Sequence, residues 1–219
     1  MAQIAFQWPV SVNYAASDFI ISGSNAEAAR FLDSWPEDSA RIALLSGPEA
    51  SGKTHLALRW KDRTGASLID QALLGTLASA ELWNGHTHAI LEDIHNIIDE
   101  TAFFHLLRHA ESHNLCLLLT SRMHVPLLPF TLPDLRSRLL ALPAPHIDAP
   151  DEMALHGFLM KYCADHQLQV HEDVIAYLMR RMERSFTVGQ ALMDKISRNS
   201  IETKREITIP FIKPLIENM

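Results

Sequence analysis

The glycine-rich loop at residues 47–54 most constrains what this chain can fold into. It reads GPEASGKT and fits G-x-x-x-x-G-K-[ST] at every fixed position. An apolar run at residues 42–45 precedes it, and the residues that follow have the composition of a helix start. A strand, this loop and a helix N-terminus together form a phosphate cradle, because backbone N–H groups and the positive helix end face phosphate oxygens. A chance glycine turn would not need these flanks, so we predict a site for ADP or ATP.

Residues 42–147 alternate between apolar strand segments and helical segments. The expected strands are 42–45, 66–70, 88–93, 115–121 and 144–147, and the expected helices include 26–35, capped by Asn25, 71–83 and 99–113. Strands that are apolar throughout indicate a parallel sheet that is covered on both faces. We therefore predict an α/β fold, with a five-stranded parallel sheet covered by helices.

The chain is expected to have three parts. Residues 1–17 lack a helical period and are read as an extended arm, residues 18–150 form the nucleotide-binding α/β domain, and residues 151–219 form a small all-helical domain. No apolar run reaches the length of about 18 residues that a membrane span needs. Two cysteines in apolar or helical stretches, and no secretory signal, favour a cytoplasmic protein.

Five polar residues, two in the glycine loop and three at strand ends, are candidates for chemistry. The loop pattern places Lys53 at the terminal phosphates and Thr54 at a Mg²⁺ ion. Glu92 and Asp93 end an apolar strand, where one carboxylate can hold Mg²⁺ and the next can orient an attacking water. Ser121 ends the following strand and can touch the terminal phosphate or that water. Strand-end hydroxyls are common, so this last indication is weak on its own.

Arg138 follows the sheet region on a short predicted helix, beside Arg136. An arginine that points across a subunit boundary can stabilise charge on a neighbour's phosphates. A surface arginine in a salt bridge would have the same sequence position, so position alone does not choose between the two. The formal net charge of −7 counts against direct, strong binding of DNA, which requires clustered Lys and Arg.

The order of these features resembles the AAA+ ATPases, and within them the DnaA/Hda family. The stretch LPDLRSRL at residues 132–139 is similar to a family segment that carries the arginine finger, which implies that role for Arg138. The stretch from Asp18 to Ala26 looks like the start of the family's adenine pocket, which implies that Phe19 and Ile20 contact the base. The resemblance implies that the helical domain is the lid of the nucleotide site.

The cofactor site that the motif and the resemblance imply consists of Phe19, Ile20, Gly47, Pro48, Ala50, Ser51, Gly52, Lys53, Thr54, His55, Arg184 and Thr187. The family usually carries an arginine in the lid that contacts the nucleotide. Thr187 stands at that place here, and Arg184 lies three residues earlier as a substitute. Loss of that contact would suit a protein that holds ADP and hydrolyses little itself.

The N-terminal segment Gln3-Ile4-Ala5-Phe6 stands where the family carries a glutamine-led motif that docks on the DNA sliding clamp. Ile4 replaces the usual Leu, and the two apolar residues that normally close the motif are replaced by Gln7-Trp8. The resemblance implies two partners, the β subunit clamp of DNA polymerase III and the initiator DnaA. The implied function is to stimulate hydrolysis of ATP bound to DnaA, which prevents re-initiation.

Other readings stay open at this point. A stand-alone P-loop ATPase or small-molecule kinase would use the same loop, although the tail lacks the cluster of phosphate-clamping arginines that a kinase lid carries. A DnaA-like replication adaptor would share the whole pattern. Homo-oligomerisation and ATP hydrolysis by the chain itself also stay open.

Overall fold

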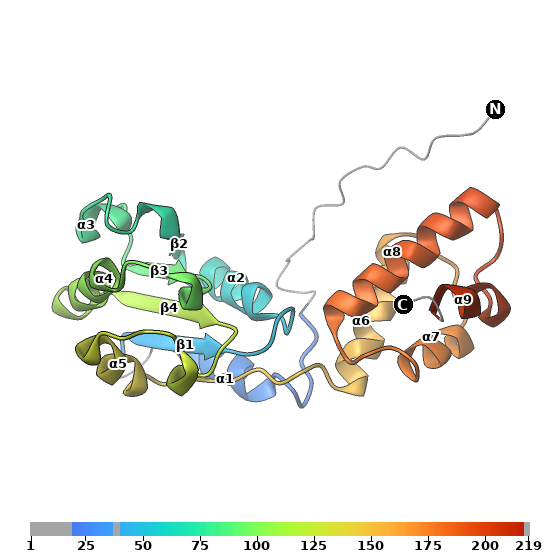
Figure 1. Ribbon diagram of the computed structural model, residues 1–219, viewed down its shortest axis with the longest axis horizontal. Coiled ribbons are helices and arrows are strands. Elements are labelled where there is room, and N and C mark those ends of the chain that lie inside the picture. The colour runs from blue at the N-terminus through green and yellow to red at the C-terminus, as the bar shows by residue number, and fades with distance from the viewer. Residues whose placement is uncertain (1–18, 37–39, 217–219) are drawn as a thin grey trace. The chain divides into compact units, whose positions relative to one another are not determined.

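A computed structural model describes residues 19–36 and 40–216 (Figure 1). The chain divides into two compact units, one that ends at Asp148 and one that begins at Ala149. We call them the α/β unit and the helical unit. Gln3, Ile4 and Phe6 lie outside the described residues.

The α/β unit is built around a parallel sheet. Its strands are β1 (Ile42–Ser46), β2 (Ser67–Leu68), β3 (His88–Leu91) and β4 (Cys116–Ser121). They lie in the order β1-β4-β3-β2, and every neighbouring pair is parallel. The long pairing of β1 with β4 runs from Ile42 opposite Leu117 to Ser46 opposite Ser121. All strands therefore end at one edge of the sheet, which is where β1 leads into the glycine loop.

The described sheet has four strands, so the prediction of five is wrong in number. Residues 143–147 do run alongside β1, where Leu44 and Ser46 donate their N–H groups to the carbonyls of Pro143 and Pro145, both at 3.0 Å. Only the Ser46–His146 pair forms a bridge. Pro143 and Pro145 have no N–H to donate, so a continuous ladder cannot form at this edge.

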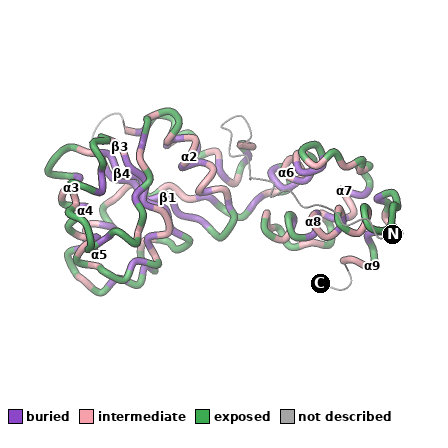
Figure 2. Tube along the Cα trace, turned by 90° about the horizontal axis from the view of Figure 1, so that it is seen from above, coloured by how far each residue is buried: buried purple, intermediate pink, exposed green. Residues whose placement is uncertain are grey.

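Helices cover both faces of the sheet. The α/β unit contains α1 (Ala26–Ser34), α2 (Lys53–Thr64), α3 (Ser79–Leu82), α4 (Glu100–Ser112) and α5 (Pro133–Leu140). One buried cluster joins Leu44, Leu91 and Leu117 to α3, α4 and α5, and a second joins Leu45 and Leu118 to α1 and α2. Alternate residues of β1, β3 and β4 thus enter opposite cores, which explains why these three strands are largely apolar and buried in Figure 2, whereas the short edge strand β2 is not.

Two local expectations about helices are corrected. Residues 71–83 form a short 3₁₀ turn at Gln71–Leu73 and then α3, because Gly75 takes φ +79° between them and cannot continue a helix. Asn25 occupies the N-cap position of α1, but its side chain makes no cap bond. It accepts from Ser22 N at 2.9 Å and donates to Ile20 O at 2.9 Å, and so it fixes the stretch before the helix.

The helical unit has its own core. It contains α6 (Glu152–Asp165), α7 (Glu172–Met179), α8 (Phe186–Thr203) and α9 (Ile209–Ile216). Leu159, Ile175 and Met193 are fully buried in a cluster drawn from this unit alone. Within residues 19–36 and 40–216, no helix combines the length and the hydropathy that crossing a membrane would need.

Leu118→Ala tests the two-faced core of the α/β unit. Leu118 is fully buried in the central strand β4, so the free energy of unfolding should fall by about 2–5 kcal/mol. The matched control is Leu127→Ala, whose side chain is 65% exposed and which should cost about 0.5 kcal/mol or less. Trp35, Trp60 and Trp83 are all buried in this unit and the described helical unit contains no tryptophan, so urea unfolding of a Trp8→Phe background followed by tryptophan fluorescence reports this unit. Equal shifts for the two variants would contradict the assignment of this core.

Candidate nucleotide-binding site

The glycine loop lies at the carboxyl end of β1, where close packing requires glycine at two positions. A Cβ added to Gly47 would lie 2.5 Å from the Ile147 carbonyl oxygen. Gly52 has φ +98°, which disfavours other residues, and its Cβ would lie 3.3 Å from the Phe19 ring. Gly47 N donates to Ser121 O at 3.1 Å, so the loop is tied to the end of the neighbouring strand β4.

Lys53 begins α2 and its side chain turns back over the loop. Its Nζ donates to the carbonyls of Gly47 at 2.9 Å and Pro48 at 2.6 Å. Burial lowers the pKa of Lys53, and Arg122 lowers it further, whereas the carboxylates of Asp93, Glu49 and Glu92 raise it. An ammonium that is taken out of water and bonded to loop carbonyls is well placed to bind an anion.

Within the part of the chain that the structure describes, two buried side-chain oxygen atoms at this edge have no hydrogen-bond partner. Ser51 Oγ, inside the loop, and Glu92 Oε1, after β3, are both buried without a hydrogen bond. Buried polar atoms are normally satisfied, so an unpaired pair beside Lys53 fits a site that a ligand completes. Among the described residues, no group of three or more His, Cys, Asp or Glu side chains is placed to hold a metal ion. A Mg²⁺ ion here would therefore share Thr54 and Glu92 with phosphate oxygens, as Mg²⁺ sites in nucleotide-binding proteins do.

The two carboxylates after β3 are held in different ways. Asp93 has φ +51° and donates its N–H to Thr120 Oγ1 at 3.0 Å. The Glu92 carbonyl accepts a bond from Gln71 Nε2, and the Glu92 carboxylate is near enough to Lys53 to raise the pKa of that lysine. The left-handed conformation of Asp93 is uncommon for a non-glycine residue, and the Thr120 hydroxyl stabilises it.

Ser121 is fully buried at the end of β4. Its Oγ accepts from Met123 N at 2.9 Å, and its carbonyl accepts from Gly47. The hydroxyl keeps a proton that it can donate, but in this arrangement its main contacts hold the turn that follows β4. Residue 122, rather than 121, presents a polar side chain to the loop.

Sequence reasoning missed three residues of this cluster. Arg122 Nη1 contacts Glu49 Oε2 at 2.8 Å, and Arg122 Nε lies 3.9 Å from Asp93 Oδ1. His95 Nδ1 lies 4.0 Å from the same Asp93 oxygen, and burial lowers the pKa of His95. Arg122 could have been found from its position in the sequence, because it directly follows Ser121, the predicted strand end.

The other end of the loop is aromatic. The Phe19 and His55 rings meet edge to face, with centroids 5.2 Å apart. Asn25 fixes the carbonyl of Ile20 beside them. Phe19, Ile20 and His55 thus lie at the start of α2, where an apolar surface could receive a base next to phosphates held by the loop.

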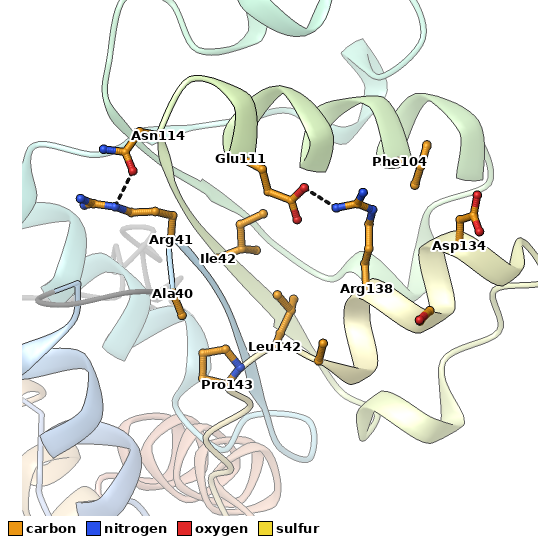
Figure 3. A pocket seen from close by; sticks show the side chains of 12 residues that line it. Ala40, Arg41, Ile42, Phe104, Glu111, Asn114, Asp134, Arg138, Leu142 and Pro143 are labelled. Atoms are coloured by element: carbon orange, nitrogen blue, oxygen red, sulfur yellow. Dashed lines mark hydrogen bonds and ion pairs between the residues drawn. The ribbon is translucent and has the colours of Figure 1, made fainter.

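Arg138 is not part of this cluster. It lies on α5 and lines an open hollow of about 820 Å³ together with Arg41 and Ile42 at the start of β1, Asn114 just before β4, and Pro143 (Figure 3). These residues mark the amino ends of the parallel strands, whereas the loop lies at their carboxyl ends. The five residues of β1 separate the two edges by about 13 Å, at about 3.3 Å per residue.

Helix α4 holds Arg138 and its helix in place. The guanidinium is paired with Glu111 and lies over the Phe104 ring, 5.3 Å from its centroid, and Figure 3 shows both partners on the same helix. At the other end of α4, the Glu100 carboxylate accepts from Thr131 N at 2.9 Å and from Leu132 N at 2.6 Å. These bonds lower the pKa of Glu100, and they fix the segment that starts α5.

The predicted lid residues lie in the helical unit. Arg184 is exposed just before α8, and Thr187 is exposed in the first turn of that helix. Ser185 caps the helix by accepting from Val188 N at 3.4 Å. The structure thus gathers residues 47–55, Glu92, Asp93 and Ser121 at one sheet edge, and places Arg138 at the other.

Solved structures with a similar fold include replication initiators and the Holliday junction branch migration motor RuvB of Thermotoga maritima. The fold superposes on domain III of the Thermotoga maritima initiation protein DnaA with a TM-score of 0.78, at 14% identity, covering 96% of this chain and 98% of that one. It also matches the replication initiator DnaA bound to AMPPCP and single-stranded DNA, with a TM-score of 0.68 and 18% identity, over 88% of this chain and 68% of that one. A third structure, of a DNA replication initiation factor, matches with a TM-score of 0.73 and 18% identity, over 86% of this chain but only 65% of that one.

Sequence comparison matches one part of the chain to a family model. Residues 151–216 match the family model described as the lid domain of Hda. The helical unit thus resembles the lid of Hda, and the fold is that of the AAA+ domain of DnaA. The resemblance drawn from the sequence, and the AAA+ fold, are thereby confirmed. An uncharacterized protein of Haemophilus influenzae is 25% identical over 207 residues, which cover 84% of this chain and 87% of that protein.

Lys53→Ala tests whether the loop binds nucleotide. The variant removes a charge-assisted contact to phosphate, so the Kd for ADP should rise by about 10- to 100-fold. Isothermal titration with ADP measures it, and Lys61→Ala, on the same helix, is the control and should change Kd by less than threefold. Similar losses in both variants would show that the loop is not the site.

Proposed function

We propose that this chain, with nucleotide in its own loop and docked on the DNA sliding clamp, stimulates hydrolysis of ATP bound to DnaA and so restrains re-initiation of replication. The observation that carries the proposal is the position of Arg138. Its side chain is 35% exposed at the sheet edge opposite the chain's own phosphate loop. An arginine there is placed to reach a neighbouring protein and not the nucleotide of its own chain.

The surroundings of Arg138 suit a catalytic arginine that acts on a partner. The Phe104 ring supports one face of the guanidinium, which restricts the side chain before any partner arrives. Glu111 neutralises the charge in the free protein. Since this pair is solvent-exposed it contributes little stability, and a partner's triphosphate can replace the carboxylate at small cost.

The chemistry asked of Arg138 is electrostatic. Charge accumulates on the transferring phosphoryl group of the partner's ATP, and a guanidinium can bind two of its oxygens at once. DnaA with ADP would be the product. In this proposal the chain's own loop binds nucleotide without having to hydrolyse it, with Lys53 on phosphate and Thr54 on Mg²⁺.

The lid residues suit a site that binds nucleotide better than a site that hydrolyses it. Thr187 lacks the charge that would sense a third phosphate, and Arg184 is exposed before α8. We therefore expect ADP to be an adequate ligand and the chain's own hydrolysis to be slow. The acidic net charge of −7 is consistent with reaching DNA through the clamp rather than by direct contact.

Arg138→Ala tests the proposed arginine finger. Stimulated release of phosphate from DnaA–ATP, in the presence of clamp-loaded DNA, should fall by about 10³- to 10⁵-fold, towards the unstimulated rate. Affinity for ADP should not change, because Arg138 lies at the other sheet edge. Arg136→Ala is the matched control, an exposed arginine on the same helix, and should keep full stimulation. Full stimulation by Arg138→Ala would refute the finger assignment.

Gln3→Ala with Phe6→Ala tests the clamp motif at the N-terminus. These residues supply the polar and aromatic contacts of the proposed motif, so the double variant should lose binding to the β clamp in surface plasmon resonance. It should also lose stimulation of DnaA, while its thermal unfolding stays that of the wild type. Unaltered clamp binding would remove this part of the proposal and leave the role of Arg138 intact.

A further inference from the structure

Two histidines lie together at the carboxyl end of α4, away from the phosphate loop. His109 is in the last turn of the helix, and His113, four positions later, is its C-cap residue. Residues four positions apart lie on the same face of a helix, one turn from each other. The two rings are stacked, with centroids 4.1 Å apart and an angle of 28° between their planes. His113 is exposed and His109 is partly buried, so solvent reaches the pair.

A hydrogen bond determines which ring nitrogen of His113 is free. Its Nδ1 lies 3.0 Å from the carbonyl oxygen of His109. A carbonyl only accepts hydrogen bonds, so Nδ1 carries the proton and Nε2 of the neutral ring keeps its lone pair. Metal-binding histidines have this arrangement, in which one ring nitrogen donates to a carbonyl and the other holds the ion. Burial lowers the pKa of His109, and His113 lowers it further, which favours the neutral imidazole that binds metals.

The separation of the two rings suits ligands of a single ion. Zn²⁺ binds an imidazole nitrogen at about 2.0–2.1 Å, so two such nitrogens on one ion lie at most about 4.2 Å apart. Rings with centroids 4.1 Å apart reach this separation by small side-chain rotations. The helix beneath them is held firmly, since Leu106, Leu107 and Ala110 are buried. The carboxyl end of a helix also favours a cation, because its last carbonyls carry partial negative charge.

We propose that His109 and His113 form a binding site for a divalent transition metal ion such as Zn²⁺. His105 is exposed one turn earlier, but its ring lies beside Phe104, with centroids 6.0 Å apart. Since the described part of the chain holds no group of three or more His, Cys, Asp or Glu side chains placed for a metal ion, water would complete the coordination. An ion at this site would brace the turn that carries Glu111, the partner of Arg138.

Isothermal titration of the untagged chain with zinc chloride, without nucleotide, tests the site. The wild type should bind Zn²⁺ with a Kd of about 1–100 µM. His109→Gln and His113→Gln should each raise this Kd by about 10-fold or more, because a single imidazole cannot chelate the ion. Millimolar Mg²⁺ should not compete, since Mg²⁺ prefers oxygen ligands.

His86→Gln is the matched control. His86 is also exposed, and its Nδ1 also lies near a carbonyl oxygen, that of Gly65 at 3.1 Å, but no histidine stands four positions from it in the sequence. The variant should change the Kd for Zn²⁺ by less than threefold. Thermal unfolding is a second measurement, in which Zn²⁺ at tenfold Kd should raise the unfolding temperature of the wild type by about 3–6 °C. Neither His109→Gln nor His113→Gln should show this rise, and without metal both should unfold as the wild type does.

Three results would overturn the proposal. The first is a wild-type chain that binds no Zn²⁺ at concentrations up to about 1 mM, where affinity is too weak for a chelating pair. The second is unchanged Zn²⁺ affinity in both His109→Gln and His113→Gln, which would assign the ion to other residues. The third is an equal loss of affinity in His86→Gln, which would show that Zn²⁺ binds surface histidines without preference for this pair.

Discussion

The parallel pairing of β1 with β4 is the constraint on which the proposed function depends. Because both strands point the same way, all their carboxyl ends meet at one edge, where Gly47 N is bonded to Ser121 O. The amino ends meet at the opposite edge, beside α5 and Arg138. One chain thus presents a phosphate cradle on one side and a cation on the other. An antiparallel neighbour in the place of β4 would mix the two sets of residues.

Each edge of the sheet carries cationic side chains that could bind phosphate, Lys53 and Arg122 at one edge and Arg138 at the other. At the cradle, Lys53 is buried and Arg122 is paired to an exposed carboxylate, so a phosphate would replace contacts that are individually weak. At the far edge, Arg138 rests on Phe104 and Glu111, while Glu100 anchors the start of its helix. Helix α4 therefore positions α5 through Glu100. It also neutralises the charge of Arg138 on α5 through Glu111.

The sequence was informative where a motif demands special backbone or where a strand is buried on both faces. The loop from Gly47 to Thr54 and the apolar strands were predictable for these reasons. The break at Gly75 was not predictable, because composition alone favours a helix there. The absence of a fifth strand, which Pro143 and Pro145 prevent, was not predicted either. Arg122 and Glu49 were missed because their pairing joins residues 73 positions apart, and no local pattern records such a contact.

The central claim is that the hydrolysed ATP belongs to the partner. The direct test is a single-turnover experiment with DnaA preloaded with ATP labelled at its terminal phosphate and this chain preloaded with unlabelled ADP, on clamp-loaded DNA. The account predicts that labelled phosphate is released faster than from DnaA alone, since Arg138 acts on the partner's nucleotide. Release that accelerates only when this chain itself holds the labelled ATP would contradict the account.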